Sequence, residues 1–289
     1  ASLFGESPRT GYCSLKISQE EIKHTIFSHP EFTKYAQSME ETFKEWKEKH
    51  RALLKNLATG MKPKEIIRGL AEDLLMAFSK TNLIDKYDIY EHLMNYWAEI
   101  MQDDMYLIAV DGWKATTYRI VEKDKKGKEK DMGWTCDLVS KDLVVNRYFN
   151  KEKETIAEQQ IKLDNATREI EELIEENSGE EGYFADFEKV NKASVSARMK
   201  QMKGESEDVE ELKVMEKYLL LQEQETEAKK IIKEDEKTLE TQVMSKYNTL
   251  TESEIKELVV DDKWMVALEQ AIKGEMDRIS QRLTQRIKE

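Results

Sequence analysis

The sequence has little glycine, proline or cysteine. Its 289 residues include 11 glycines, 3 prolines and 2 cysteines. Glycine and proline supply the turns that connect strands, and at about 4% and about 1% of the chain, against usual values of ~7% and ~5%, they argue against a sheet-rich fold. Cys13 and Cys136 lie far apart without CxxC spacing, which argues against a disulfide framework and a cysteine zinc site.

The sequence also lacks long apolar runs and an excess of positive charge. No run of about 18 apolar residues is present, and no charged-then-apolar leader opens the sequence, so we expect a cytoplasmic protein without a membrane-spanning helix. The formal net charge of −13 opposes nucleic-acid binding over the whole surface, because phosphate affinity comes from clustered lysine and arginine. A local basic patch stays compatible with this charge.

Charged residues make up 36% of the sequence and hydrophobic residues 39%, whereas ~25% and ~45–50% are usual. Because the sequence has too few apolar residues for one compact globular core, its composition favours long helices that are exposed to solvent on one side. We expect a mainly α fold, a helical bundle with a long antiparallel coiled-coil hairpin and a small antiparallel β insertion. The expected parts are a linker over 1–17, a helical region over 18–104, the β insertion over 105–140, the hairpin over 141–250 and terminal docking helices over 251–289.

The β insertion is predicted from a change in residue pattern at Met105. Met105–Val110 is a continuous apolar run, and the following Asp111-Gly112 is a hairpin-turn signal. Thr116–Val121 is rich in β-branched and aromatic residues, and Gly133–Cys136 is a candidate third strand. Farther along, apolar residues recur at helical spacing over 141–178 and 205–248, which predicts two long helices packed as a hairpin.

Common catalytic motifs are missing. The sequence has no GxGxxG, GxxxxGK[ST], HExxH or GxSxG pattern, so the usual phosphate loops, zinc sites and serine nucleophiles find no support. The acid pair Asp103-Asp104 suggests acid–base chemistry, but adjacent helical residues point about 100° apart and do not face one site together. We interpret the second pair, Asp261-Asp262, as the entrance of a last helix that begins at Lys263, where the helix dipole favours acids.

A lysine cluster follows the predicted strand. Five lysines stand against Asp124, Glu129 and Asp131, which gives a local net charge of +2. Either this segment is a solvated hairpin tip, or its lysines contact the DNA backbone. The lysines are Lys123, Lys125, Lys126, Lys128 and Lys130.

The last helix carries an apolar stripe at spacings of three and four residues. We predict that it docks a partner, with the equally weighted alternative that it packs on the long hairpin of the same chain. The sequence stops while the stripe is still running, and we expect it to be a piece of a longer protein. The predicted docking residues are Trp264, Leu268, Ile272, Met276, Ile279, Leu283 and Ile287.

Several stretches of this sequence resemble the carboxy-terminal portion of modification subunits from type I restriction-modification systems. The likeness runs through nearly the whole chain. The stretches are Ser7–Tyr12 (SPRTGY), Tyr87–Glu99 (YDIYEHLMNYWAE) with Met101–Asp104 (MQDD), Lys125–Lys130 (KKGKEK) with Gly133–Leu138 (GWTCDL), and Leu258–Trp264 (LVVDDKW).

The resemblance implies a parent subunit that transfers a methyl group from S-adenosylmethionine to adenine N6 of DNA, with residues 1–17 leading from a missing catalytic domain. This family's catalytic motif, Asn or Asp followed by two prolines and an aromatic residue, is absent, because Pro8, Pro30 and Pro63 are isolated. No catalytic, cofactor or metal residue is therefore carried over. The implied partners are the specificity subunit, a second modification subunit, the restriction subunit, and DNA through the complex, with no membrane. Composition alone leaves the alternative of an independent coiled-coil scaffold without a DNA role.

Overall fold

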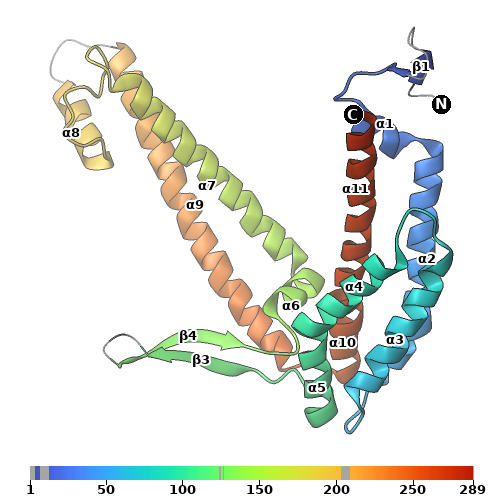
Figure 1. The fold of residues 1–289 in the computed structure, drawn as a ribbon. Coiled ribbons are helices and arrows are strands. Elements are labelled where there is room, and N and C mark those ends of the chain that lie inside the picture. Colours follow the sequence, from blue (N-terminus) through green and yellow to red (C-terminus); the bar gives the residue numbers. More distant parts are fainter. Residues whose placement is uncertain (1–3, 7–12, 124, 126, 203–208, 289) are drawn as a thin grey trace. The chain divides into compact units, whose positions relative to one another are not determined.

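A computed structural model describes residues 4–6, 13–123, 125, 127–202 and 209–288 of the chain. The fold is mainly α, as the composition predicts, with two small antiparallel sheets (Figure 1). The chain divides into two units. Unit 1 contains residues 1–143 and 250–289, and unit 2 contains residues 144–249. Unit 2 nearly coincides with the region predicted as the helical hairpin.

The amino-terminal helices of unit 1 begin at sequence signals for helix starts. Before α1, Ser18 and Glu21 exchange the hydrogen bonds of a capping box. Pro63 opens α3, where its missing N–H costs nothing, and Asp85 caps α4 by accepting the Tyr87 N–H. The helices are α1 (Ile22–Ser28), α2 (Pro30–Lys55), α3 (Pro63–Ala77) with a 3₁₀ turn (Phe78–Lys80), and α4 (Lys86–Tyr96).

The strand predicted over Met105–Val110 is wrong, because this segment is the helix α5 (Gln102–Asp111). A π-helical turn (Trp97–Met101) joins α4 to α5, so one helical path runs on through the apolar run. Met105 and Ile108 are buried at helical spacing in the core of unit 1. An apolar run of six residues does not distinguish a buried strand from a buried helix. Gly112, with φ +77°, ends the helix instead of turning a hairpin.

The sheets are both two-stranded and antiparallel. β1 (Phe4–Glu6) pairs with β2 (Cys13–Leu15), so part of the predicted irregular linker is paired strand. β3 (Tyr118–Lys123) pairs with β4 (Glu129–Thr135), which makes the predicted third strand the second strand of a hairpin. The register shifts between Arg119 and Val121, and the shift places Gly133, with φ +99°, in a bulge.

One continuous helical path closes unit 1. A capping box at Thr251 starts α10 (Glu252–Lys256), a π-helical segment (Glu257–Met265) follows, and α11 (Val266–Lys288) completes the path. The prediction that Asp261-Asp262 marks a helix entrance is therefore wrong, since both acids lie inside the π-helical segment. Asp261 is instead held by α2: Arg51 donates two hydrogen bonds to its carboxylate, at 2.7 and 2.8 Å, and Lys55 donates one at 2.7 Å.

Unit 2 is a pair of long helices with a small cluster at one end. α7 (Asn150–Asn177) and α9 (Val209–Tyr247) pack side by side (Figure 1), and α6 (Lys141–Tyr148) leads into α7 with a break at Phe149. Near the end of α7, a buried cluster joins both helices to α8 (Lys192–Met202). The cluster consists of Ile170, Leu173, Phe184, Val195, Met202, Met215, Tyr218 and Leu221.

Over the part of the chain that the structure describes, no helix is long and apolar enough to cross a membrane.

Candidate functional site

A buried polar joint connects two parts of unit 1 that lie about 160 residues apart in the sequence. Lys263 Nζ donates to Asp104 Oδ1 at 2.8 Å and to the Leu138 carbonyl at 3.1 Å. Trp264 Nε1 donates to Asp104 Oδ2 at 2.7 Å. Asp104 and Trp264 are 3% and 0% exposed. The joint thus ties α5, the loop after β4 and the π-helical segment before α11 together.

Burial raises the pKa of Asp104, and the hydrogen bonds from Lys263 and Trp264 partly offset this effect. Because both carboxylate oxygens already accept hydrogen bonds from the protein, Asp104 serves as an anchor and is not set up for proton transfer. Burial also raises the pKa of Tyr96, whose hydroxyl donates to the Lys263 carbonyl at 3.2 Å. The sequence-level hypothesis of acid–base chemistry at Asp103-Asp104 therefore gains no support from this geometry.

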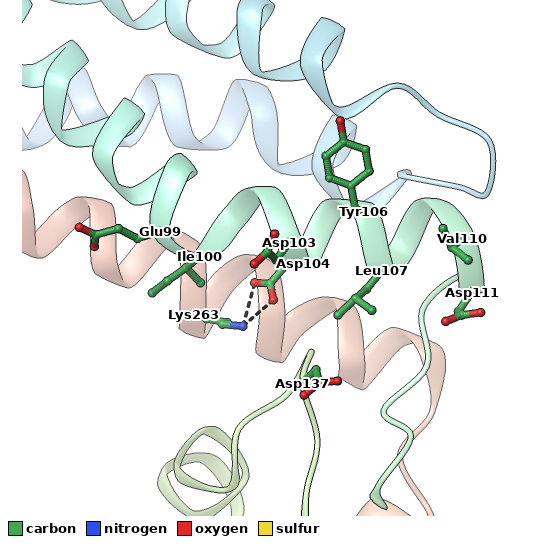
Figure 2. A pocket seen from close by; sticks show the side chains of 10 residues that line it. All are labelled: Glu99, Ile100, Asp103, Asp104, Tyr106, Leu107, Val110, Asp111, Asp137 and Lys263. Atoms are coloured by element: carbon green, nitrogen blue, oxygen red, sulfur yellow. Dashed lines mark hydrogen bonds and ion pairs between the residues drawn. The ribbon is translucent and has the colours of Figure 1, made fainter.

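An open groove of about 610 Å³ lies beside this joint, and we call it the α5 groove (Figure 2). Its lining carries five acidic side chains and a single basic one, Lys263, whose ammonium group points at Asp104 in Figure 2. Among the apolar lining residues, Ile100 is 38% exposed and Val110 is 73% exposed. The residues that line the groove are Glu99, Ile100, Asp103, Asp104, Tyr106, Leu107, Val110, Asp111, Asp137 and Lys263.

The charge of the α5 groove limits its chemistry. An excess of carboxylates repels phosphates and nucleic acid and favours basic groups. Within the described residues, no group of three or more His, Cys, Asp or Glu side chains could hold a metal ion. The groove is therefore better suited to contact with a basic protein segment than with nucleic acid.

The predicted docking stripe on the last helix lies largely inside unit 1. Trp264, Leu268, Ile272, Met276 and Ile279 are all at most 8% exposed, since α11 packs against α1 and α4. These five residues do not form a free surface. They pack within the same chain, as the alternative predicts, but against helices of unit 1, whereas the alternative named the long hairpin as the packing partner.

The last two predicted docking residues have a different environment. Leu283 and Ile287 are half-buried and line a groove of about 530 Å³ that we call the α11 groove. Its apolar wall includes Ile26, Phe32 and Leu83, and Leu83 is 51% exposed. The other lining residues are Thr25, His29, Glu31, Tyr35 and Asn82.

The lysines predicted as candidate DNA contacts lie at the tip of the β3–β4 hairpin. Lys123, Lys125, Lys128 and Lys130 are exposed, and Lys126 lies outside the described residues. Arg119 and Asp131 form an ion pair at 3.3 Å across the strands, which lowers the effective positive charge near the bulge.

The polar joint was missed at the sequence level, although a signal for it exists. Asp104 falls on the helical face that carries Met101, Met105 and Ile108, so a carboxylate sits within an apolar stripe. A charge at such a position needs a buried partner. The sequence pattern does not reveal that the partner is Lys263.

Comparisons with known proteins gave no match: no family model, no curated protein and no solved structure matches this chain.

Proposed function

We propose that this chain is the assembly region of a type I restriction-modification modification subunit, which joins a cytoplasmic DNA adenine-N6 methyltransferase to its specificity subunit. The methyl donor S-adenosylmethionine would belong to the parent subunit, and DNA would be reached through the complex. The second modification subunit is a further partner, and the restriction subunit is another candidate.

One observation carries this proposal. Three of the stretches on which the resemblance depends meet at one side chain, because Lys263 of Leu258–Trp264 bonds Asp104 of Met101–Asp104 and the carbonyl of Leu138 from Gly133–Leu138. Sequence stretches that share a family pattern are expected to meet in space when they form one common core. The meeting of these three supports reading them as one pattern and not as separate chance likenesses.

The α11 groove is the surface that we assign to the specificity subunit. Its lining is mainly apolar at Ile26, Phe32, Leu83, Leu283 and Ile287, which suits the apolar face of a partner helix. The groove retains the two docking residues that the core of unit 1 leaves half-buried.

The test is co-purification of the 289-residue chain with the specificity subunit encoded beside it. Leu283→Asp combined with Ile287→Asp should abolish the complex while the melting temperature stays close to that of the wild type, because both side chains are only half-buried. Gln281→Asp combined with Gln285→Asp adds the same charge at exposed positions of the same helix and should leave binding intact. A wild-type chain that forms no complex, or equal binding by all variants, would contradict the proposal. Self-association alone would favour the independent scaffold.

A further inference from the structure

The β3–β4 hairpin is exposed on both faces. All six residues of β3 and the first four of β4 are exposed. Four of them are large hydrophobic side chains, Tyr118 at 48%, Ile120 at 37%, Val121 at 52% and Met132 at 46% exposure. An isolated two-stranded hairpin is only marginally stable in water, so a ribbon of this kind gains stability from a surface that covers it.

The ribbon and the α5 groove carry opposite charge. The described residues of the ribbon carry a net charge of only +2, whereas the groove presents the exposed carboxylates of Glu99, Asp103 and Asp111. The charged residues of the ribbon are Arg119, Lys123, Lys125, Lys128 and Lys130 against Glu122, Glu129 and Asp131. The ammonium of Lys263 donates its hydrogen bonds to Asp104 and to the Leu138 carbonyl. The described residues that line the groove therefore offer no other cation to the exposed carboxylates. Both surfaces combine charge with exposed apolar side chains, which is the composition of a weak protein interface.

We propose that the β3–β4 ribbon of one copy of this chain docks in the α5 groove of a second copy. This inference deepens one part of the proposed function, the contact between two modification subunits, by naming its surfaces. Lysines at the ribbon tip would face the carboxylates of the groove. Ile120 and Met132, on one face of the ribbon, would cover Ile100, Leu107 and Val110.

The attachment of the ribbon favours a second copy over the ribbon's own groove. The Tyr118 hydroxyl donates to Asp137 at 2.6 Å, and Asp137 lines the groove, so the base of the ribbon is fixed at the groove edge. The six residues of β3 span about 20 Å at ~3.4 Å per residue, and the ribbon extends away from α5 (Figure 1), so the lysines at its tip lie away from their own groove. A two-fold axis would let each copy place its ribbon in the groove of the other, so that the assembly closes as a dimer.

Sedimentation equilibrium of the 289-residue chain tests this directly. The wild type is expected to dimerise at micromolar concentrations and low ionic strength, and to dissociate as salt screens the charges. A ribbon variant, Lys123→Glu with Lys125→Glu and Lys130→Glu, should bind itself at least about tenfold more weakly. A groove variant, Glu99→Lys with Asp103→Lys and Asp111→Lys, should show the same loss. Mixing the two variants should restore a dimer, because both contacts regain opposite charges.

The matched control reverses three exposed lysines of unit 2, Lys151→Glu with Lys162→Glu and Lys237→Glu, and should dimerise like the wild type. A monomeric wild type overturns the proposal, as does loss of the dimer in this control. Failure of the mixed variants to pair, with circular dichroism showing both folded, also overturns it. Binding of duplex DNA by a monomeric chain would assign the ribbon to nucleic acid instead. None of these results bears on binding to the specificity subunit, which is measured separately.

Discussion

Unit 1 and unit 2 are both helical, but they bury their side chains in different ways. Unit 1 surrounds a core that includes Trp264, Leu93 and Met105, and it connects distant segments through the Asp104–Lys263 pair. Unit 2 relies on the contacts between two long helices, α7 and α9, and on one buried cluster near the end of α7. The comparison teaches that amphipathic spacing alone does not distinguish a helix of a core from a helix at the surface. How deeply the apolar stripe of a helix is buried depends on the segments that pack against it.

The largest effect is expected from breaking the polar joint of unit 1. Asp104→Ala leaves the Lys263 ammonium and the Trp264 N–H without their buried acceptor, which should lower the free energy of unfolding by about 3–5 kcal/mol. All five tryptophans lie in unit 1, so urea unfolding followed by tryptophan fluorescence reports on this unit. Asp103→Ala, at the exposed neighbouring position, should change the free energy of unfolding by at most about 0.5 kcal/mol. Equal effects of the two variants would show that the joint does not stabilise unit 1.

In unit 2, truncation of α7 should cost more in the buried cluster than at half-buried positions. Ile170 is 6% exposed, and Ile170→Ala should cost about 2–4 kcal/mol. Leu163 lies on the same helix but is half-buried, so Leu163→Ala should cost about 1 kcal/mol. Hydrogen exchange of residues 160–177 in the two variants measures this difference. Equal losses of protection would mean that the helix pair is uniformly packed and that the contrast with unit 1 is wrong.

A pH effect is expected in unit 1 from His50. Burial lowers the pKa of His50, although Asp73, at 3.0 Å from its Nε2, opposes the shift. Because the unfolded chain then binds the proton more readily, the stability contributed by His50 is complete above the ordinary pKa of about 6.5 and is lost as the pH falls through the lowered value. His50→Gln should therefore flatten the fall in stability below that pH, measured by tryptophan fluorescence. His24→Gln, at an exposed position, should leave the profile unchanged, and a wild-type profile that rises toward low pH would contradict the assignment.

The smallest effect is expected at Arg51. Its side chain is 42% exposed while it holds Asp261, so solvent screens much of the ion pair. Arg51→Ala should cost about 1 kcal/mol or less. Added salt should shrink the difference between variant and wild type in urea unfolding. A salt-independent loss of several kcal/mol would mean that this pair is as deeply anchored as the Asp104–Lys263 pair.

The positions of helices could be predicted from the sequence where a capping residue and the helical spacing of apolar residues indicated the same start. The boxes at Ser18 and Thr251, proline at the start of α3, and the helices of unit 2 all rest on local signals, which neighbouring residues supply. Met105–Val110 was wrongly predicted as a strand because six apolar residues carry no period, and burial between helices decided the outcome. For the same reason, the stripe of α11 could not be assigned to a partner or to the core: its cover comes from helices more than 150 residues away in the sequence.

Hydrogen exchange of α11, with and without the specificity subunit, tests the central claim most directly. The claim is that residues 266–279 belong to the core of unit 1 and that docking uses only the end of the helix. The expected result is strong protection of 266–279 in the chain alone, unchanged on binding, together with new protection at 283–288 when the specificity subunit is added. Rapid exchange of 266–279 in the chain alone, with protection gained only in the complex, would contradict it.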